Sequence, residues 1–312
     1  MALGSNQVTT TIANNFIPEL WSDEVIGAYK SNLVVANLVT KLSHKGKKGD
    51  TIHIPVPARG SASAKAANTQ VTLSAATNTV VDVSINKHYE YSKLIEDIAE
   101  VQSLASMRKF YTDDAGYALA TQVDSKLASL WEGFQGGVVG GDNAASWEKA
   151  VIGGDGTTLY TGNSANSSAI TDAGIRAMIL KLDNADVPMD NRSLICAPVV
   201  ASYMLAINRF TEQQFIGSGD AIKTGKIGQI YGVDVFVTSN APSCTGTGGG
   251  RDTDRAGVLM HKDALCLAEQ VGVRSQTQYK QEYLGDLFTS DTIYGVGELR
   301  NDAAVAFIVP AT

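Results

Sequence analysis

The feature that most constrains the fold is a pair of alternating apolar and polar stretches on either side of a bland tip, within residues 46–92. Before the tip, Ile52, Ile54 and Val56 fall on one face of an extended chain. After it, the alternation resumes with a longer set of residues on one face: Val71, Leu73, Val81, Val83, Ile85, Tyr89 and Tyr91. Alternation with a period of two predicts the arms of a long β-hairpin that is buried on one face.

The apolar face of such a hairpin must lie on another surface, because an isolated two-stranded hairpin is only marginally stable in water. That surface belongs either to the core of the same chain or to a partner. The tip, residues 58–70, reads ARGSASAKAANTQ and offers mainly small residues that have nothing to pack. This composition favours a projecting loop that meets a partner.

The hairpin is followed by the strongest helical pattern of the chain, in residues 92–134. Apolar residues recur there at spacings of four, four and three (Leu119, Val123, Leu127 and Leu130), and no proline interrupts the stretch. We expect a short helix over 92–100, a break, and a long helix over about 103–134. Glycines at 133, 136 and 137 are suited to end the long helix.

The rest of the chain predicts shorter elements and an α+β fold. Residues 1–45 read as an arm with one small helix over 18–29, opened by Pro18. Short helices and strands alternate next, namely a helix over 171–185, a strand over 193–197, a helix from Pro198 and a strand over 232–238. A strand at 256–260 and a short helix or turn over 261–270 follow. We expect the last three strands, near 273–281, 287–296 and 303–309, to close one sheet against the long helix.

Composition excludes several classes of protein. The chain has 312 residues, 44% of them hydrophobic and 18% charged, which is typical of a globular protein. Its net charge of -7 argues against a dedicated nucleic-acid binder. No apolar run approaches the roughly 20 residues that span a bilayer, and the first residues lack the pattern of a secretory signal. The three cysteines are scattered and predict neither disulfides nor a zinc site. We therefore expect a soluble intracellular protein.

Charge is distributed unevenly along the chain. Residues 1–92 hold 8 basic and 6 acidic groups, whereas residues 93–160 hold 5 basic and 10 acidic groups. If the hairpin of one copy crossed the long helix of another, these opposite charges would favour the contact. The candidate contact residues are Lys45, Lys47, Lys48, Arg59 and Lys65 on the basic side, and Asp113 and Asp114 on the helix.

No constellation of catalytic, metal-binding or cofactor-binding residues emerges. The four histidines have no metal-ligand spacing, although His53 and His88, on the two arms of the hairpin, would be able to face each other. Adjacent acids such as Asp113 and Asp114 point about 100° apart on a helix and do not converge. Residues 224–227 and 246–257 lack the spacing of phosphate or dinucleotide loops, and the acids at 252 and 254 only faintly resemble a calcium loop. We expect no enzyme, metal or cofactor.

Four stretches, taken in order, resemble the major capsid proteins of tailed bacteriophages, which have the Hong Kong 97-type fold. They are KGKKGDTIHIPVP (45–57), the helical residues 94–130 with Asp124 near their end, GKIGQIYGVDVFVTSNAP (225–242), and GVLMHKDALCLAEQ with TIYGVGELRNDAAVAFIVP (257–270 and 292–310). The resemblance covers essentially the whole chain. It implies an N-terminal arm (1–45), an extended loop (46–92), a peripheral domain with a spine helix (93–164), an axial domain (165–257) and closing strands of the peripheral domain (258–312).

The resemblance also implies a function. The chain would self-assemble as hexamers and pentamers into the icosahedral head of a virion, in the cytoplasm of a host bacterium. It would enclose double-stranded DNA without sequence-specific binding, and its extended loop would lie over the spine helix of a neighbour. Scaffolding and portal proteins would be partners, with or without a decoration protein, and no membrane would be involved.

Some relatives join a loop lysine covalently to an asparagine of a neighbour. Lys65 and Asn301 are the residues to consider here, but no catalytic acid stands out beside them, so this bond is not expected. Two other functions stay open at this point. One is an encapsulin-type compartment shell with the same fold, and the other is a cytoplasmic α/β enzyme.

Overall fold

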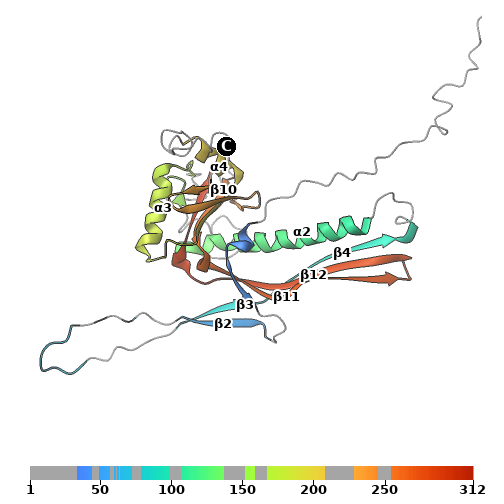
Figure 1. The fold of residues 1–312 in the computed structure, drawn as a ribbon, viewed down its shortest axis with the longest axis horizontal. Helices are drawn as coiled ribbons and strands as arrows, with labels where there is room; N and C mark the ends of the chain where they lie inside the picture. Colours follow the sequence, from blue (N-terminus) through green and yellow to red (C-terminus); the bar gives the residue numbers. More distant parts are fainter. Residues whose placement is uncertain are drawn as a thin grey trace, which may run out of the picture.

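The computed structural model describes residues 34–43, 49–56, 60, 62, 64–71, 79–98, 107–136, 152–158, 167–207, 228–244 and 254–311. The small helix expected over 18–29 lies outside these residues, as do residues 224–227 and most of residues 246–257. The described part has a mixed fold of helices and sheets, as the sequence predicts (Figure 1).

A long, narrow sheet forms one half of the described structure. Its strand order is β1 (Thr40–Ser43), β11 (Leu265–Lys280), β12 (Gly285–Glu298) and β4 (Lys87–Glu96). Strand β12 pairs antiparallel with both β11 and β4, while β1 pairs parallel with β11. We call this the long sheet. Figure 1 shows α2 (Met107–Ala128) running along it, and the helix continues as the 3-10 segment η3 (Ser129–Gly136).

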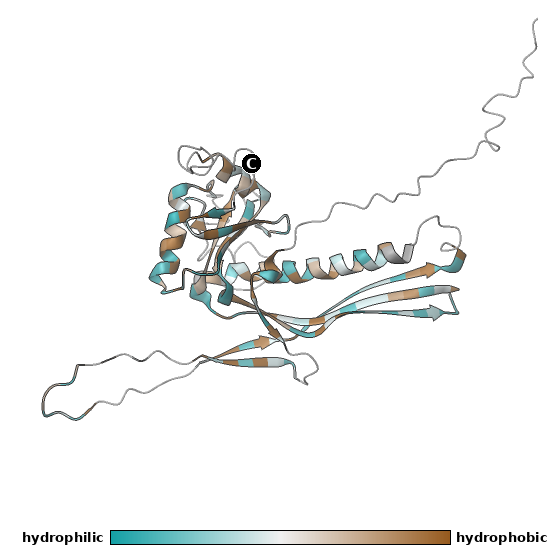
Figure 2. Cartoon of the chain, viewed as in Figure 1, coloured by the Kyte–Doolittle hydropathy of each residue, from teal (hydrophilic) through white to brown (hydrophobic). Residues whose placement is uncertain are grey.

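Helix α2 confirms the long helix that the apolar spacing predicts. Ala115, Leu119 and Leu127 are buried, and the residues between them are largely exposed or half-buried. Figure 2 shows the corresponding mixture of hydrophilic and hydrophobic residues along the helix. The α-helical hydrogen bonding ends at Ala128, and the 3-10 segment carries the chain to Gly136. In that segment Trp131 and Phe134 enter the core of the molecule.

A second sheet forms a lobe at one end of α2 (Figure 1). Its order is β5 (Ile152–Gly153), β13 (Ala304–Val309), β10 (Asp254–His261), β6 (Arg192–Cys196), β8 (Val233–Val237) and β7 (Gln229–Ile230), and β9 (Ser243–Cys244) pairs with β10. Helices α3 (Asp172–Asn184) and α4 (Pro198–Leu205) belong to the same lobe. Strands β6 and β13 are buried along their whole length, and Figure 2 shows the hydrophobic colour of the strands inside the lobe.

Local sequence signals account for the elements of the lobe. The side chain of Thr171 caps α3 by accepting a hydrogen bond from the amide of Gly174 (3.0 Å). Pro198 occupies the first turn of α4, where its missing N–H costs nothing. Tyr231 and Gly232 both have positive φ (49° and 80°), which is the geometry of a two-residue hairpin turn between β7 and β8. The helices and strands expected between residues 171 and 238 are therefore confirmed.

The hairpin predicted from the alternating pattern is confirmed at its base, whereas the prediction that Val71 lies on the apolar face of the second arm is wrong, because Val71 is exposed and outside both strands. Strand β2 (Thr51–Val56) pairs antiparallel with β3 (Thr79–Ser84). Val83 and, just after the strand, Ile85 are buried against Cys266 and Ala268 of the long sheet. A Cβ atom on Gly295 of β12 would lie 2.5 Å from the carbonyl oxygen of Ser84, so only glycine permits this crossing. The base of the hairpin thus rests on the chain's own sheet.

Two expectations about the segment after the hairpin are wrong. The second arm does not continue to Tyr91, because residues 87–96 form β4 and pair with β12 of the long sheet. The short helix expected over 92–100 is replaced by that strand up to Glu96, and only residues 97–98 of the described part are helical there. Alternation at Tyr89 and Tyr91 indicated a strand correctly but did not reveal which sheet the strand joins.

The C-terminal strands divide between the two sheets instead of closing one. Strands β11 and β12 lie in the long sheet beside α2, but β13 joins the lobe sheet between β5 and β10. The sequence of β13, AVAFIV, is apolar at every position, which suits a strand that is covered on both faces. The turn expected over 261–270 is shorter, since only Lys262–Ala264 forms a 3-10 turn (η5) and β11 begins at Leu265.

The close approach at Gly295 predicts the effect of a substitution. In Gly295→Val the new side chain meets the backbone of Ser84 and Ile85, and we expect a loss of about 1–3 kcal/mol in the free energy of unfolding, typical of overpacking. The control is Gly116→Ala on α2, where an added Cβ has nothing within 4 Å; this change should stabilise the chain by about 0.5–1 kcal/mol. Urea unfolding measures both, and equal stability of Gly295→Val and the wild type would contradict the crossing.

Candidate functional site

The tip of the hairpin is a surface that no other described part of the chain covers. All of residues 64–71 are exposed, including Lys65, and Val71 is 64% exposed. A turn shapes the tip, with Asn68 at a φ of 61° and the hydroxyl of Thr69 donating to the carbonyl of Ala66 (2.7 Å). In Figure 1 these residues lie well away from both the lobe and the long sheet. The hairpin therefore has an anchored base and a tip that is free to meet another molecule.

The structure describes only one of the basic residues that are predicted to contact a neighbouring copy. Lys45, Lys47, Lys48 and Arg59 lie outside the described residues, and Lys65 is exposed at the tip. Their contact with a neighbour stays a prediction.

The two adjacent acids of α2 have different surroundings. Asp113 is exposed, whereas Asp114 is half-buried and accepts a hydrogen bond from the hydroxyl of Tyr91 on β4 (3.0 Å). Burial, together with Asp114, raises the pKa of Tyr91 to about 12, so this hydroxyl stays protonated and keeps donating at neutral pH. Asp114 thus links the helix to the long sheet, and Asp113 is the more accessible of the two acidic residues predicted to contact a neighbour.

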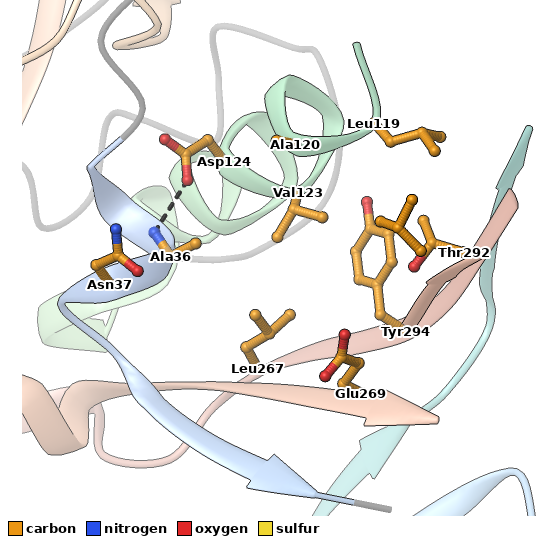
Figure 3. Close-up of a pocket in the computed structure, with 11 residues that line it drawn as sticks. Ala36, Asn37, Leu119, Ala120, Val123, Asp124, Leu267, Glu269, Thr292 and Tyr294 are labelled. Atoms are coloured by element: carbon orange, nitrogen blue, oxygen red, sulfur yellow. Dashed lines mark hydrogen bonds between the residues drawn. The ribbon is translucent and has the colours of Figure 1, made fainter. Parts of the chain in front are cut away.

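Asp124 is a buried carboxylate that ties α2 to the segment before β1. It is 1% exposed, and it accepts hydrogen bonds from the amides of Ala36 (2.9 Å) and Val35 (3.4 Å) at the start of the 3-10 turn η2 (Val35–Asn37). Figure 3 shows the bond to Ala36. Burial raises the pKa of Asp124, while hydrogen bonds from the amides of residues 34–36 act in the opposite direction. The sequence singled out Asp124 only within the resemblance and gave it no role.

Three polar side chains of the long sheet form a row of contacts across three strands. Arg274 of β11 makes two hydrogen bonds to Asp291 of β12 (2.7 and 2.8 Å), and His88 of β4 lies 3.2 Å from the same carboxylate. The hydrogen bonds from Arg274 hold the pKa of Asp291 below its usual range. His53 pairs instead with Asp82 within the hairpin (2.5 Å). The expectation that His53 and His88 face each other is therefore wrong, because their strands belong to different sheets.

The described residues contain little that resembles a catalytic centre. Among them, no group of three or more His, Cys, Asp or Glu side chains is placed to hold a metal ion. Cys196, Cys244 and Cys266 are buried, and burial raises the pKa of Cys196 to about 12, which leaves it an unreactive thiol. The side-chain amide of Asn301 donates to the carbonyl of Gly133 (2.7 Å). None of the described helices has the length and apolar character needed to cross a membrane.

Solved structures share this arrangement over almost the whole chain. A chain from Mycobacterium phage Che8 superimposes with a TM-score of 0.74 and 26% identity, covering 94% of this chain and 97% of that one. The capsid structure of cyanophage P-SCSP1u gives a TM-score of 0.75 at 18% identity, covering 99% and 97%. This chain has the fold of bacteriophage capsid proteins. The capsid asymmetric unit of cyanophage Pam1, at 11% identity, has a TM-score of 0.70 and covers 99% of both chains.

Comparison of sequences alone finds no such relatives. No protein-family model matches the chain, and no curated protein has a significant match to it. The similarity to capsid proteins therefore lies in the order and packing of the elements. This agrees with a sequence in which four stretches resemble the capsid family by their layout.

The burial of Asp124 predicts a dependence of stability on pH. Because the pKa of Asp124 is raised in the folded state, folding favours its protonated form. The associated stability is fully present below the pKa of an unfolded aspartate, about 3.9, and is lost as the pH rises through the folded pKa. The wild type should thus gain stability relative to Asp124→Asn, which does not titrate, as the pH falls from neutral.

The measurement is the free energy of unfolding of both chains in urea across this pH range. Asp113→Asn, which removes an exposed carboxylate from the same helix, provides the baseline. The account would be contradicted if the stability of the wild type relative to Asp124→Asn stayed constant or fell as the pH was lowered.

Proposed function

We propose that this chain is the structural major capsid protein of a tailed bacteriophage. It self-assembles into the icosahedral head shell that encloses double-stranded DNA, and it resides in the virion. The observation that carries this proposal is the fold held in common with phage capsid structures over nearly the full length of each chain. The exposed, projecting hairpin tip adds a surface suited to contact between copies.

Within this proposal the fold is of the Hong Kong 97 type. Residues 1–45 are the arm, 46–92 the extended loop, 93–164 and 258–312 the peripheral domain, and 165–257 the axial domain. Helix α2 along the long sheet supports the peripheral assignment. The axial domain points toward the centre of a hexamer or pentamer, and its sheet also takes in β10 and β13 from the end of the chain.

Contacts between subunits follow from the hairpin and the helix. The extended loop of one copy lies over α2 of a neighbour, where Lys45, Lys47, Lys48, Arg59 and Lys65 meet an acidic surface that includes Asp113 and Asp114. Two observations support a contact between the hairpin tip of one copy and α2 of another. The tip around Lys65 makes no packed contact within the described part of the chain, and Asp113 is exposed on α2.

The other features of the proposal concern partners and chemistry. Assembly in the host cytoplasm uses a separate scaffolding protein and a portal protein, with or without a decoration protein. The shell encloses DNA without reading its sequence, in keeping with the net charge of -7, since a protein of negative net charge does not attract the packaged DNA. The role is structural rather than enzymatic.

Sedimentation velocity of the purified full chain tests this function, with electron microscopy of any rapidly sedimenting fraction. We expect closed icosahedral shells, and nucleic-acid absorbance in particles made during infection. Shells that contain only cargo protein would indicate a compartment of the encapsulin type instead. A stable dimer or tetramer, unchanged by added scaffolding protein and across salt and concentration, would contradict a capsid.

Charge reversal tests the proposed contact between subunits. The variant Lys45→Glu, Lys47→Glu, Lys48→Glu should give a low yield of particles, because the reversed charges repel α2 of the neighbour. Its free energy of unfolding should stay within about 0.5 kcal/mol of the wild type, because the proposed contact forms only between copies. Particle yield is read from the rapidly sedimenting fraction.

Two further variants make this result specific. Lys262→Glu, an exposed reversal in the turn before β11, is the control and should assemble normally. Adding Asp113→Lys to the triple variant should restore part of the yield. Normal assembly of the triple variant would remove the electrostatic contact from the proposal.

A further inference from the structure

A cavity opens between α2 and the long sheet, next to the tie made by Asp124. Its volume is about 270 Å³, and apolar side chains from η2, the helix and the sheet form most of its wall: Ala36, Leu119, Ala120, Val123, Leu267 and Val273. Ala120 is exposed and Val273 is 56% exposed, so this apolar wall is open to solvent. Figure 3 shows Val123 of the helix opposite Leu267 and Tyr294 of the sheet. The cavity thus offers uncovered apolar surface beside α2.

Charge within the cavity does not decide what covers this surface. The carboxylate of Asp124 is taken up by the amides of Val35 and Ala36 (3.4 and 2.9 Å), and Glu269, which also lines the cavity, has an interaction of its own. Burying the remaining apolar wall is favourable in proportion to the area removed from water. A fitting partner is therefore an apolar side chain that is itself exposed.

This chain carries such a side chain at the tip of its hairpin. Val71 is 64% exposed, and it is the one large apolar residue among the described residues of the tip (60, 62 and 64–71). Most of its neighbours there are small, so little bulk would hinder its entry into a recess. Figure 1 shows the hairpin projecting away from α2 of its own chain. A second copy is therefore needed to bring a valine and a cavity together.

A pair of opposite charges gives the direction in which the tip would lie. Asp113 and Ala120 are both exposed on α2 and are seven residues apart, so they share one face of the helix about 10 Å apart. Lys65 and Val71 are six residues apart, and the turn over 66–69 brings them closer than the roughly 20 Å of an extended chain. With Val71 in the cavity, Lys65 is thus within reach of Asp113. Asp113 has an interaction within its own chain, and a carboxylate can accept several hydrogen bonds, so it can also receive the lysine.

We propose that this cavity is the seat for Val71 of a second copy's hairpin, with Lys65 of that copy paired to Asp113. Val71 packs against Ala120 and Val273, which are the exposed part of the apolar wall. The inference rests on the proposed function and deepens it, because it names the point on α2 at which the tip docks. The apolar seat fixes the position of the tip along the helix, which charge attraction alone does not do.

Disulfide cross-linking in assembled particles of the full chain tests this seat. The variant Val71→Cys, Ala120→Cys places both new thiols at exposed positions, whereas the three native cysteines are buried. A disulfide needs Cα atoms within about 7 Å of each other, so mild oxidation should join the copies into a ladder of covalent oligomers on a non-reducing gel. The matched control is Val71→Cys, Gln122→Cys. Gln122 is also exposed but lies about 200° around α2 from Ala120, so this variant should stay monomeric on the gel.

Substitution of Val71 tests whether the apolar contact contributes to assembly. Val71→Asp brings a charge to an apolar wall and should raise the protein concentration needed for assembly about tenfold, as expected for the loss of one favourable contact per copy. Val71→Ile keeps the apolar character and should assemble like the wild type. Because Val71 is exposed in the single chain, urea unfolding should find both variants as stable as the wild type.

The outcomes separate this inference from the proposed function. Shells of the Val71→Cys, Ala120→Cys variant that do not cross-link, or shells that cross-link equally through Gln122→Cys, would overturn the seat and leave the capsid function in place. Assembly of Val71→Asp at the concentration of the wild type would also overturn it. A wild-type chain that forms no shells in the sedimentation experiment would contradict the capsid function, and this inference with it.

Discussion

The contact between the base of the hairpin and β12 is the constraint on which the rest of the structure depends. Val83 and Ile85 are buried at this crossing, and Gly295 allows the two backbones to approach closely. The apolar residues at the base of the hairpin are thus buried against the chain's own long sheet. The tip beyond them has mainly small and polar residues, and it covers no other part of the chain that the structure describes. An anchored base with a projecting tip is a suitable geometry for joining one copy to the next.

Helix α2 connects the other parts to this base. Its C-terminal end and the 3-10 segment after it place Trp131 and Phe134 in the core of the lobe. Along its length it is linked to β4 through Asp114 and Tyr91, and to the segment before β1 through Asp124. The helix therefore fixes the lobe, the long sheet and the start of the described chain relative to one another.

The sequence predicted elements well where the pattern is local and failed where pairing is between distant segments. The spacing of Leu119, Val123 and Leu127 was enough for α2, and Pro198 marked the start of α4. Alternation at Tyr89 and Tyr91 gave a strand, but the partner of that strand lies about 200 residues away in β12, and no local signal identifies it. For the same reason, the sequence predicted one sheet for β11, β12 and β13, although β13 belongs to the lobe sheet. The apolar character of β13 on both faces was the available signal that it belongs inside the lobe.

The candidate site also combines features that the sequence indicated with features that it did not. Composition indicated an exposed tip with Lys65 and an acidic helix with Asp113, and both are exposed in the structure. The roles of Asp114 and Asp124 depend on partners 23 and 88 residues away, respectively, so residue type alone did not reveal them. The cavity beside Tyr294 arises from the packing of α2 over two strands of the long sheet, which no pattern in the sequence describes.

The most direct measurement is a cryo-electron microscopy reconstruction of the assembled particles in which residues 60–71 are traced. The account predicts that the hairpin tip of each subunit lies on α2 of an adjacent subunit, with the base still seated at Gly295 of its own chain. A tip folded back onto its own lobe or long sheet, with α2 of the neighbour left uncovered, would contradict it.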